Sequence, residues 1–269
     1  MSYFTVTKYN DSLYQIKDAL GVLATLVIGS KKALLFDTCY GIGDLKKEVE
    51  SITDKPLIVV NSHGHMDHAC GNYQFESVFI HEDDIELCKK HCGVDRRKRN
   101  IEAAKRINVL PEGFDVEGYL NKGTGNLKVL NVGDVFDLGN VDLEVIKMEG
   151  HTKGSIGLFI KEWKLMLVSD AACPFVWLFL EESMPLSAYV KMLERTLKYD
   201  FNSFLVGHGA VMYPRSKMEE FYDVAKNVEM DKIFKVSFDN FQDCNSYCYT
   251  RGKLYGAGDC GIIFDPRRL

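Results

Sequence analysis

The sequence has no long uncharged apolar run, and it does not begin with a basic region followed by an apolar stretch. Its longest uncharged apolar runs are 19–29 and 171–180, both shorter than the ~20 residues that a membrane-spanning helix needs. A secretory signal would show a basic region and then an apolar one. These absences predict a cytoplasmic protein with no membrane partner.

Cysteine and positive charge are also limited. Eight cysteines in 269 residues do not resemble a disulfide framework, so we expect reduced thiols. Cys244, Cys248 and Cys260 are candidates for a zinc knot, but their spacing is irregular and no histidine accompanies them. The net charge of −5 gives no reason to expect a nucleic-acid partner.

The remaining composition is that of one globular domain covering 1–269, since 46% of the residues are hydrophobic and no repeat or linker is visible. Apolar runs of strand and helix type alternate, which favours an α/β layered fold. Strands are expected at 3–8, 13–17, 23–28, 33–36, 57–60, 77–80, 156–160, 165–168 and 204–206. Helices are expected at 44–51, 82–91, 186–197 and 218–225. Between 127 and 145 the apolar period changes to two and predicts a β-meander.

Two segments allow more than one interpretation. Segment 94–121 begins with a run of basic residues and is either a helix with a solvated face or a mobile lid that attracts an anionic substrate. Segment 233–269 is rich in tyrosine, cysteine and glycine. We expect it to be a strand-rich C-terminal extension and a candidate contact for a homo-oligomer.

A dense group of metal-capable side chains follows the apolar run 57–60. His63, His65, Asp67 and His68 lie within six residues, in the loop after that strand and in the helix expected to begin near Met66. Side chains at a strand end face the crevice where ligands bind in α/β proteins. Imidazole and carboxylate are zinc ligands, and a catalytic zinc site leaves one position open for water.

Three further metal-capable residues occupy similar places. His151 and Asp170 follow β-like runs, and His208 follows the strand at 204–206. Each is flanked by glycine or small residues, which allow a backbone to approach a ligand closely. Of the other histidines, we expect His81 to be a hydrogen-bonded structural residue and His91 to be a surface residue.

Together these residues form the pattern His63-x-His65-x-Asp67-His68, then His151 in Gly-His-Thr-x-Gly-Ser, then Asp170 and His208. Over residues 10–230 the chain resembles the metallo-β-lactamase superfamily. Leu35-Phe36-Asp37-Thr38 resembles another signature of that family, in which the aspartate supports the ligands. The resemblance implies an αββα sandwich with metals at one edge of the paired sheets.

The resemblance also implies a dinuclear site that acts on a small-molecule substrate. His63, His65 and His151 would hold one ion, Asp67, His68 and His208 the other, and Asp170 would bridge them with a hydroxide. Asp67 and Asp170 would thereby be the catalytic carboxylates. Two divalent transition metal ions are expected. Zinc is favoured by ligand type, while iron and manganese accept the same ligands.

Within the superfamily, individual residues narrow the choice. Asp170 argues against a true β-lactamase, and His65 argues against the di-iron flavoprotein branch. The acidic charge and the lack of a recognisable tRNA-binding insertion argue against a tRNA-processing nuclease. The chain thus resembles the glyoxalase II-like hydrolases and lactonases, which act on esters, thioesters or lactones. A mononuclear iron dioxygenase of the persulfide type, a phosphodiesterase or nuclease, and a binding module with a vestigial site stay open.

Some residues near the motif depart from the usual pattern. Cys39 stands where glycine is common, and Cys70 and Cys173 lie close in sequence to expected ligands. They are either packed thiols or soft groups that modulate the site. The stretch 173–179 after Asp170 is rich in aromatic residues, and it is either core or a hydrophobic substrate wall.

Overall fold

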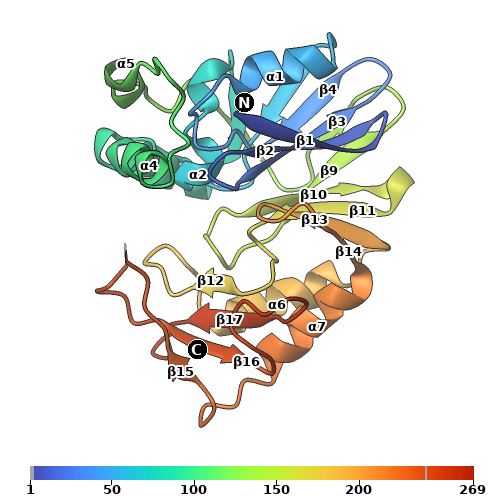
Figure 1. Ribbon diagram of the computed structural model, residues 1–269. Coiled ribbons are helices and arrows are strands. Elements are labelled where there is room, and N and C mark those ends of the chain that lie inside the picture. Colours follow the sequence, from blue (N-terminus) through green and yellow to red (C-terminus); the bar gives the residue numbers. More distant parts are fainter. Residues whose placement is uncertain (1–2, 240) are drawn as a thin grey trace.

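The computed structural model describes residues 3–239 and 241–269. Two mixed β-sheets face each other, and helices cover the outer face of each (Figure 1). The αββα sandwich expected from the sequence is therefore the observed fold. Among the described residues, no helix is long and apolar enough to cross a membrane.

The first sheet has the strand order β1-β2-β3-β4-β5-β6-β7. Its strands are β1 Phe4–Asn10, β2 Leu13–Asp18, β3 Leu23–Ile28, β4 Ala33–Phe36, β5 Leu57–Val60, β6 Val78–His81 and β7 Leu127–Leu130. The second sheet has the order β14-β13-β11-β10-β9-β8. Its strands are β8 Val135–Asp137, β9 Asp142–Lys147, β10 Ile156–Ile160, β11 Leu165–Ser169, β13 Ser203–Val206 and β14 Met212–Pro214.

Apolar side chains from both sheets meet in a common core. Phe36 and Val60 of the first sheet belong to the same buried cluster as Leu158 and Leu205 of the second. Each fully buried aliphatic or aromatic side chain contributes about 1.5–3 kcal/mol through removal from water. This core holds the two sheets together and fixes the relative positions of their strand ends.

The outer helices pack on the opposite face of each sheet. The first sheet is covered by α1 Leu45–Ile52, α2 Met66–Ala69, α3 Ile85–His91, α4 Val94–Arg106 and α5 Val116–Leu120, and the second by α6 Leu186–Thr196 and α7 Arg215–Lys226. Short 3₁₀ turns occur at η1 Asn72–Gln74, η2 Glu82–Asp84 and η3 Lys161–Trp163.

Helix α4 has a buried side as well as a solvated one. Arg97 is fully buried, and its guanidinium donates to the backbone carbonyls of Cys92, Lys122, Cys70 and Gly123 at 2.9–3.0 Å. Four backbone acceptors around one buried cation attach the helix to the loops beside the predicted metal residues, because a buried guanidinium requires such partners.

The prediction of a single β-meander over 127–145 was wrong, because the strands of this segment belong to two different sheets. β7 pairs in parallel with β6 in the first sheet, whereas β8 and β9 form a hairpin in the second. The chain crosses from one sheet to the other between Leu130 and Val135. Val129, Val132 and Val135 are spaced three residues apart and all three are exposed, so these apolar residues do not mark one shared buried face.

The C-terminal segment forms a small sheet of its own with the order β12-β17-β16-β15. Its strands are β12 Val176–Leu178, β15 Phe234–Lys235, β16 Tyr247–Thr250 and β17 Gly261–Phe264. β17 pairs in parallel with β12, the strand that follows Asp170. The expected terminal strand pair therefore exists, but it is joined to the middle of the same chain. A homo-oligomer contact through this segment stays a prediction.

Candidate metal centre

Parallel pairing brings the loops that carry the predicted site residues to one edge of the sandwich. In the first sheet β4 pairs with β5, and in the second β11 pairs with β13. Parallel strands present their carboxyl ends at the same edge. Asp37 and the 61–65 loop therefore lie beside each other, and Asp170 lies beside His208.

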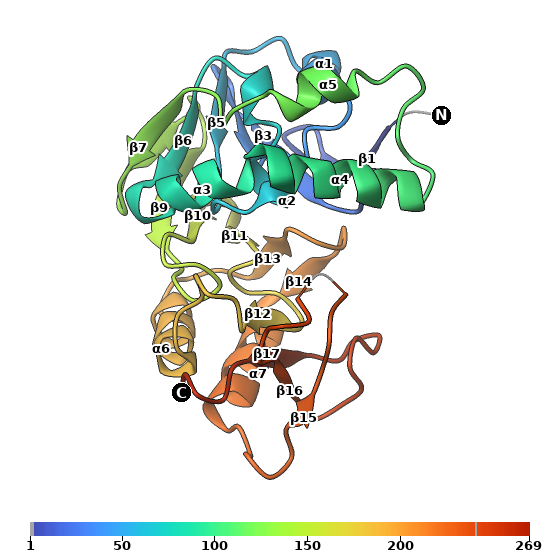
Figure 2. The same ribbon diagram turned by 90° about the vertical axis from the view of Figure 1, so that its left-hand side faces the viewer.

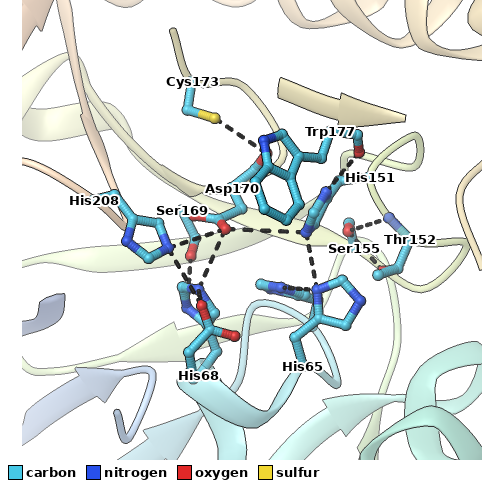
Figure 3. Close-up of polar contacts among 12 residues, drawn as sticks. His65, His68, His151, Thr152, Ser155, Ser169, Asp170, Cys173, Trp177 and His208 are labelled. Carbon is cyan, nitrogen blue, oxygen red and sulfur yellow. Dashed lines mark hydrogen bonds and ion pairs between the residues drawn. The ribbon is translucent and has the colours of Figure 1, made fainter. Parts of the chain in front are cut away.

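The first group of predicted ligands consists of three buried histidines. His65 Nδ1 lies 3.0 Å from His63 Nε2. It also lies 2.9 Å from His151 Nε2 (Figure 3). His65 is also the N-cap residue of α2, which begins at Met66 as predicted. Three ring nitrogens from two distant loops thus converge on one point.

The second group contains two carboxylates and two histidines. Asp67 Oδ2 lies 3.4 Å from His68 Nε2 and 3.3 Å from His208 Nε2. Asp170 Oδ2 lies at the same distances from these two nitrogens. The same Asp170 oxygen is 3.9 Å from His151 Nε2, so Asp170 connects the second group to the first. The structure brings all seven sequence-predicted residues together.

The outward nitrogens of the histidines determine which tautomer each ring adopts. His65 Nε2 lies 2.7 Å from the Glu182 carboxylate, and His151 Nδ1 lies 2.8 Å from the Trp177 carbonyl. Both partners can only accept, so the outward nitrogen carries the proton. Each of these rings therefore directs its unprotonated nitrogen inward.

The same argument applies to the other two histidines of the 61–68 segment. His68 Nδ1 lies 2.9 Å from Asp37 Oδ2 and must donate to it. The Ser62 hydroxyl donates to Asp37 Oδ2 at 2.8 Å, so it accepts from His63 Nδ1, also at 2.8 Å. Hydrogen bonds of this type orient metal-binding histidines.

These tautomers provide a test of whether the residues fit a metal. In the first group, lone pairs of neutral imidazoles face one another at about 3 Å with no proton between them. Such an arrangement is repulsive unless a cation lies among them. For a zinc–nitrogen distance of 2.0–2.1 Å, tetrahedral ligands are about 3.3 Å apart. The donor set therefore fits a metal ion.

Two orphaned atoms in the second group support the same conclusion. His68 Nε2 and Asp170 Oδ1 are buried and have no hydrogen-bond partner among the described residues. Buried polar atoms are normally paired, so each unpaired one requires an explanation. Gly207 is also tightly enclosed, because a Cβ there would lie 2.5 Å from Asp170 Oδ1 and 2.7 Å from His68 Cε1. A side chain at position 207 would therefore displace Asp170 and His68, two of the predicted metal ligands.

The two groups differ in their electrostatics. Burial, followed by the neighbouring histidines, lowers the pKa of His63 well below its usual range, and the same causes lower the pKa of His151 to about 4. Burial alone would lower the pKa of His68, but Asp67, Asp170 and Asp37 raise it well above 6.5. His63 and His151 are thus held in the neutral form, whereas the second group contains two carboxylates, which favour a nearby cation.

Asp84 joins the loops of the first group, a role that no pattern in the sequence indicated. Its carboxylate accepts from the backbone N–H of Gly64 at 2.8 Å, the N–H of Gly154 at 2.8 Å and the Thr152 hydroxyl at 2.7 Å. The His63–His65 loop and the His151 loop are therefore attached to one buried side chain.

His91 was expected on the surface, and this was wrong. It is buried, and its ring stacks on that of His65 with a centroid distance of 4.9 Å. His65, His91 and Glu182 make a third group with metal-capable atoms close together. The physical reason is that the end of α3, which carries His91, lies against the site. His81, expected as a structural residue, accepts from the Asp83 backbone N–H at 3.3 Å.

The cysteines near the motif are mostly packed thiols. Cys39 and Cys70 are buried, and burial raises the pKa of each well above its usual value. Cys173 is half-buried and lines the cavity described next. Among the described residues, the groups that could hold a metal contain no cysteine, so the suggested zinc knot of Cys244, Cys248 and Cys260 is not formed.

A cavity of about 820 Å³ is lined by five of the seven residues: His65, Asp67, His151, Asp170 and His208. One wall is aromatic and apolar and includes Phe175, Trp177, Leu180, Phe241 and Tyr255. The 173–179 stretch is therefore both core and cavity wall, because Trp177 also packs on Phe179 and Phe238. The C-terminal segment contributes Phe241 and Tyr255 to the same wall.

The αββα fold and the clustered histidines and aspartates define a class of metal-binding α/β proteins. The family model of the metallo-beta-lactamase superfamily matches residues 18–237, and the chain belongs to that superfamily.

Curated relatives match about half of this chain and about half of their own length. The acyl-coenzyme A thioesterase MBLAC2 of Homo sapiens is 27% identical over 157 residues, covering 54% of this chain and 56% of that protein. The protein of the same name from Gallus gallus is 28% identical over 160 residues, covering 54% and 55%.

Solved structures show the same fold at low sequence identity. The metallo-beta-lactamase family protein TTHA1429 from Thermus thermophilus is 21% identical, with a TM-score of 0.58 and 80% of each chain covered. The sec-alkylsulfatase Pisa1 from Pseudomonas sp. is 16% identical, with a TM-score of 0.61, covering 83% of this chain and 41% of that one. At these identities the likeness establishes the fold alone.

Proposed function

We propose that this protein is a metal-dependent hydrolase that cleaves acyl thioesters at a dinuclear centre. The observation that carries the proposal is the position of Asp170. Its Oδ2 lies 3.3–3.4 Å from nitrogens of the second group and 3.9 Å from His151 of the first. A single carboxylate oxygen between two sets of inward-facing donors suits a pair of cations better than one.

The residues divide into two ligand sets. His63, His65 and His151 would hold one ion, Asp67, His68 and His208 the other, and Asp170 would contact both. The chemistry that bound divalent ions supply is the activation of water near neutral pH and the polarisation of a carbonyl group. Zinc is favoured by these donors, and iron or manganese would also fit.

The chain's own residues orient the reaction and accept its proton. Asp67 and Asp170 both line the cavity, and the Oδ2 of each lies 3.3 Å from His208 Nε2, so these carboxylates can accept the proton that an attacking water loses. Water oxygen then bonds to the acyl carbon, the carbon–sulfur bond breaks, and the departing thiolate recovers a proton. Asp37, Glu182 and the Trp177 carbonyl keep the histidine rings in place during this sequence.

The substrate class is inferred from the cavity and the curated relatives. Proteins that match about half of this chain are named acyl-coenzyme A thioesterases. The aromatic wall formed by Phe175, Trp177 and Tyr255 suits an apolar acyl chain, since such pockets bind through apolar burial. Esters and lactones also present an acyl carbon that water can attack, and we propose them as weaker substrates. We also propose that residues 1–269 act as one domain, since β12 and β17 pair within the small sheet.

The test combines metal analysis with a substrate panel. Gently purified protein, and protein reconstituted with zinc, iron or manganese, is assayed with acyl thioesters, lactones and phosphodiesters while oxygen is monitored. We expect about two metal ions per chain and the highest kcat/KM on an acyl thioester. One iron ion per chain with oxygen consumption would indicate a persulfide dioxygenase. Preferred phosphodiester cleavage would indicate a nuclease, and no turnover would indicate a binding module.

A further inference from the structure

A basic side chain without a partner lies opposite the aromatic wall of the cavity. Arg96, in the first turn of α4, is half-buried and lines the cavity close to His91 and Glu182. Among the described residues, none forms a hydrogen bond or an ion pair with its guanidinium. Lys217 also lines the cavity, but it donates to Glu220 and to the Gly258 carbonyl at 2.6 Å each. Arg96 is thus free to bind an anion.

Glu182 compensates the positive charge of Arg96 only in part. Glu182 is nearby, but its Oε1 is held by His65 at 2.7 Å. Burial, followed by the positive charge of Arg99, lowers the pKa of Arg96, and Glu182 opposes this effect. An arginine remains protonated in proteins even so. Partial removal of a guanidinium from water costs free energy when no acceptor is present, and binding of an anionic ligand would offset that cost.

Helix α4 adds a wider positive field around Arg96. It carries six basic residues and two acidic ones, within a chain whose net charge is −5. Figure 2 shows α4 on one side of the molecule's central region, with β12 and the C-terminal strands on the other. The cavity lining therefore combines Arg96 from α4 with aromatic side chains such as Phe175, Trp177 and Tyr255.

We propose that Arg96 binds an anionic group, phosphate or carboxylate, on the thiol half of the substrate. The proposal rests on the thioesterase function proposed above. A thioester lying over the seven-residue centre would direct its acyl chain to Trp177 and its thiol half to α4. Arginine recognises phosphate and carboxylate through paired N–H groups, so it would select thioesters by the charge of their thiol half.

The experiment compares Arg96→Gln with Arg99→Gln on substrates that share one acyl group. Arg99 is exposed and does not line the cavity, so its variant removes an equal charge from the same helix without a direct contact. The substrates are hexanoyl thioesters of coenzyme A, of glutathione and of neutral N-acetylcysteamine. For Arg96→Gln we expect the ratio of kcat/KM on a charged thioester to that on the neutral one to fall about tenfold or more, mainly through KM.

The two charged substrates distinguish the source of the anion. A fall confined to the coenzyme A thioester assigns phosphate, and a fall confined to the glutathione thioester assigns carboxylate. An unchanged ratio in Arg96→Gln, or an equal fall in Arg99→Gln, overturns the proposal, because each would mean that no direct contact exists.

A binding measurement separates this proposal from the proposed function. Calorimetric titration with free coenzyme A and with glutathione needs no turnover. Weaker binding of either thiol to Arg96→Gln than to Arg99→Gln supports the anion site even if no thioester is hydrolysed. If thioesters are hydrolysed but both variants bind the free thiols equally, the proposed hydrolase function stands and the proposed role of Arg96 is excluded.

Discussion

His68 Nδ1 lies 2.9 Å from Asp37 Oδ2, although the two residues are 31 positions apart in sequence. Asp37 also accepts from the Ser62 backbone N–H at 2.7 Å and from the Ser169 hydroxyl at 2.7 Å. Its backbone has φ +72°, which is uncommon outside glycine. The carboxylate of one residue with positive φ, which follows β4, therefore links the loop after β5, helix α2 and the end of β11.

Asp37→Asn is expected to weaken metal binding by about 10–100-fold. Asparagine tolerates positive φ, so the backbone should persist, but an amide cannot accept from all the donors around Oδ2. His68 would then lose the partner that fixes its tautomer. Competition with a chelator, followed by elemental analysis, measures the change. Unchanged metal affinity in a folded variant would show that the hydrogen bond does not orient His68.

Asp170→Asn is expected to reduce the metal content from two ions per chain toward one. The neutral amide cannot offset repulsion between two cations, and the set of Asp67, His68 and His208 would lose its shared ligand. Activity should fall ~10²-fold or more. Asp200→Asn is the matched control, because Asp200 is an exposed carboxylate paired with Lys164. A folded Asp170→Asn protein with two ions and normal turnover would exclude the dinuclear mechanism.

Trp177→Ala is expected to raise KM for long acyl chains about tenfold while metal content stays near that of the unchanged protein. The indole lines the cavity, whereas the contact to His151 uses the Trp177 backbone carbonyl, which alanine retains. Trp163→Ala is the control, since Trp163 is the only other tryptophan in the sequence, is half-buried against the core between the sheets and does not line the cavity. Phe175→Ala should act in the same direction. Unchanged kinetics in both Trp177→Ala and Phe175→Ala would show that this wall does not contact the substrate.

Asp18 is expected to make stability fall as the pH rises from about 4 to 6. Its Oδ1 accepts from the N–H groups of Leu20, Gly21 and Val22, but its Oδ2 is buried with no hydrogen-bond partner among the described residues. Burial raises the pKa of Asp18 to about 6, although these backbone hydrogen bonds oppose the shift. In this pH window the folded state holds a proton that the unfolded state has lost, so rising pH favours unfolding.

The variant Asp18→Asn should lack this dependence, because its amide oxygen can keep the three hydrogen bonds without a charge. Relative to the unchanged protein, its free energy of unfolding should therefore improve by roughly 1–3 kcal/mol between pH 4 and pH 7. Denaturant titration of both proteins, each stripped of metal, measures the difference. Parallel pH profiles for the two proteins would contradict the expected pKa of Asp18.

The sequence by itself determined the strands that build the site and the residues at their ends. The strands at 23–28, 33–36, 57–60 and 156–160 have the predicted bounds, because continuous apolar runs between turn residues have few alternatives to a buried strand. The seven site residues lie at strand ends: His63, His65, Asp67, His68, His151, Asp170 and His208. The parallel pairs β4–β5 and β11–β13 and the antiparallel β9–β10 pair, whose connection carries His151, bring these ends to one edge. Spacing along the chain was therefore enough to predict that these seven residues meet.

Tertiary structure alone decided which side chains surround them. Glu182 and Asp84 are ordinary acidic residues in sequence, and His91 lies in a basic helix end. Each gains its role from a contact across loops: Glu182 with His65, Asp84 with Gly64 and Thr152, and His91 with the His65 ring. Such contacts depend on how layers pack. For the same reason, local alternation could not assign β7 to one sheet and β8 to the other, or pair β17 with β12.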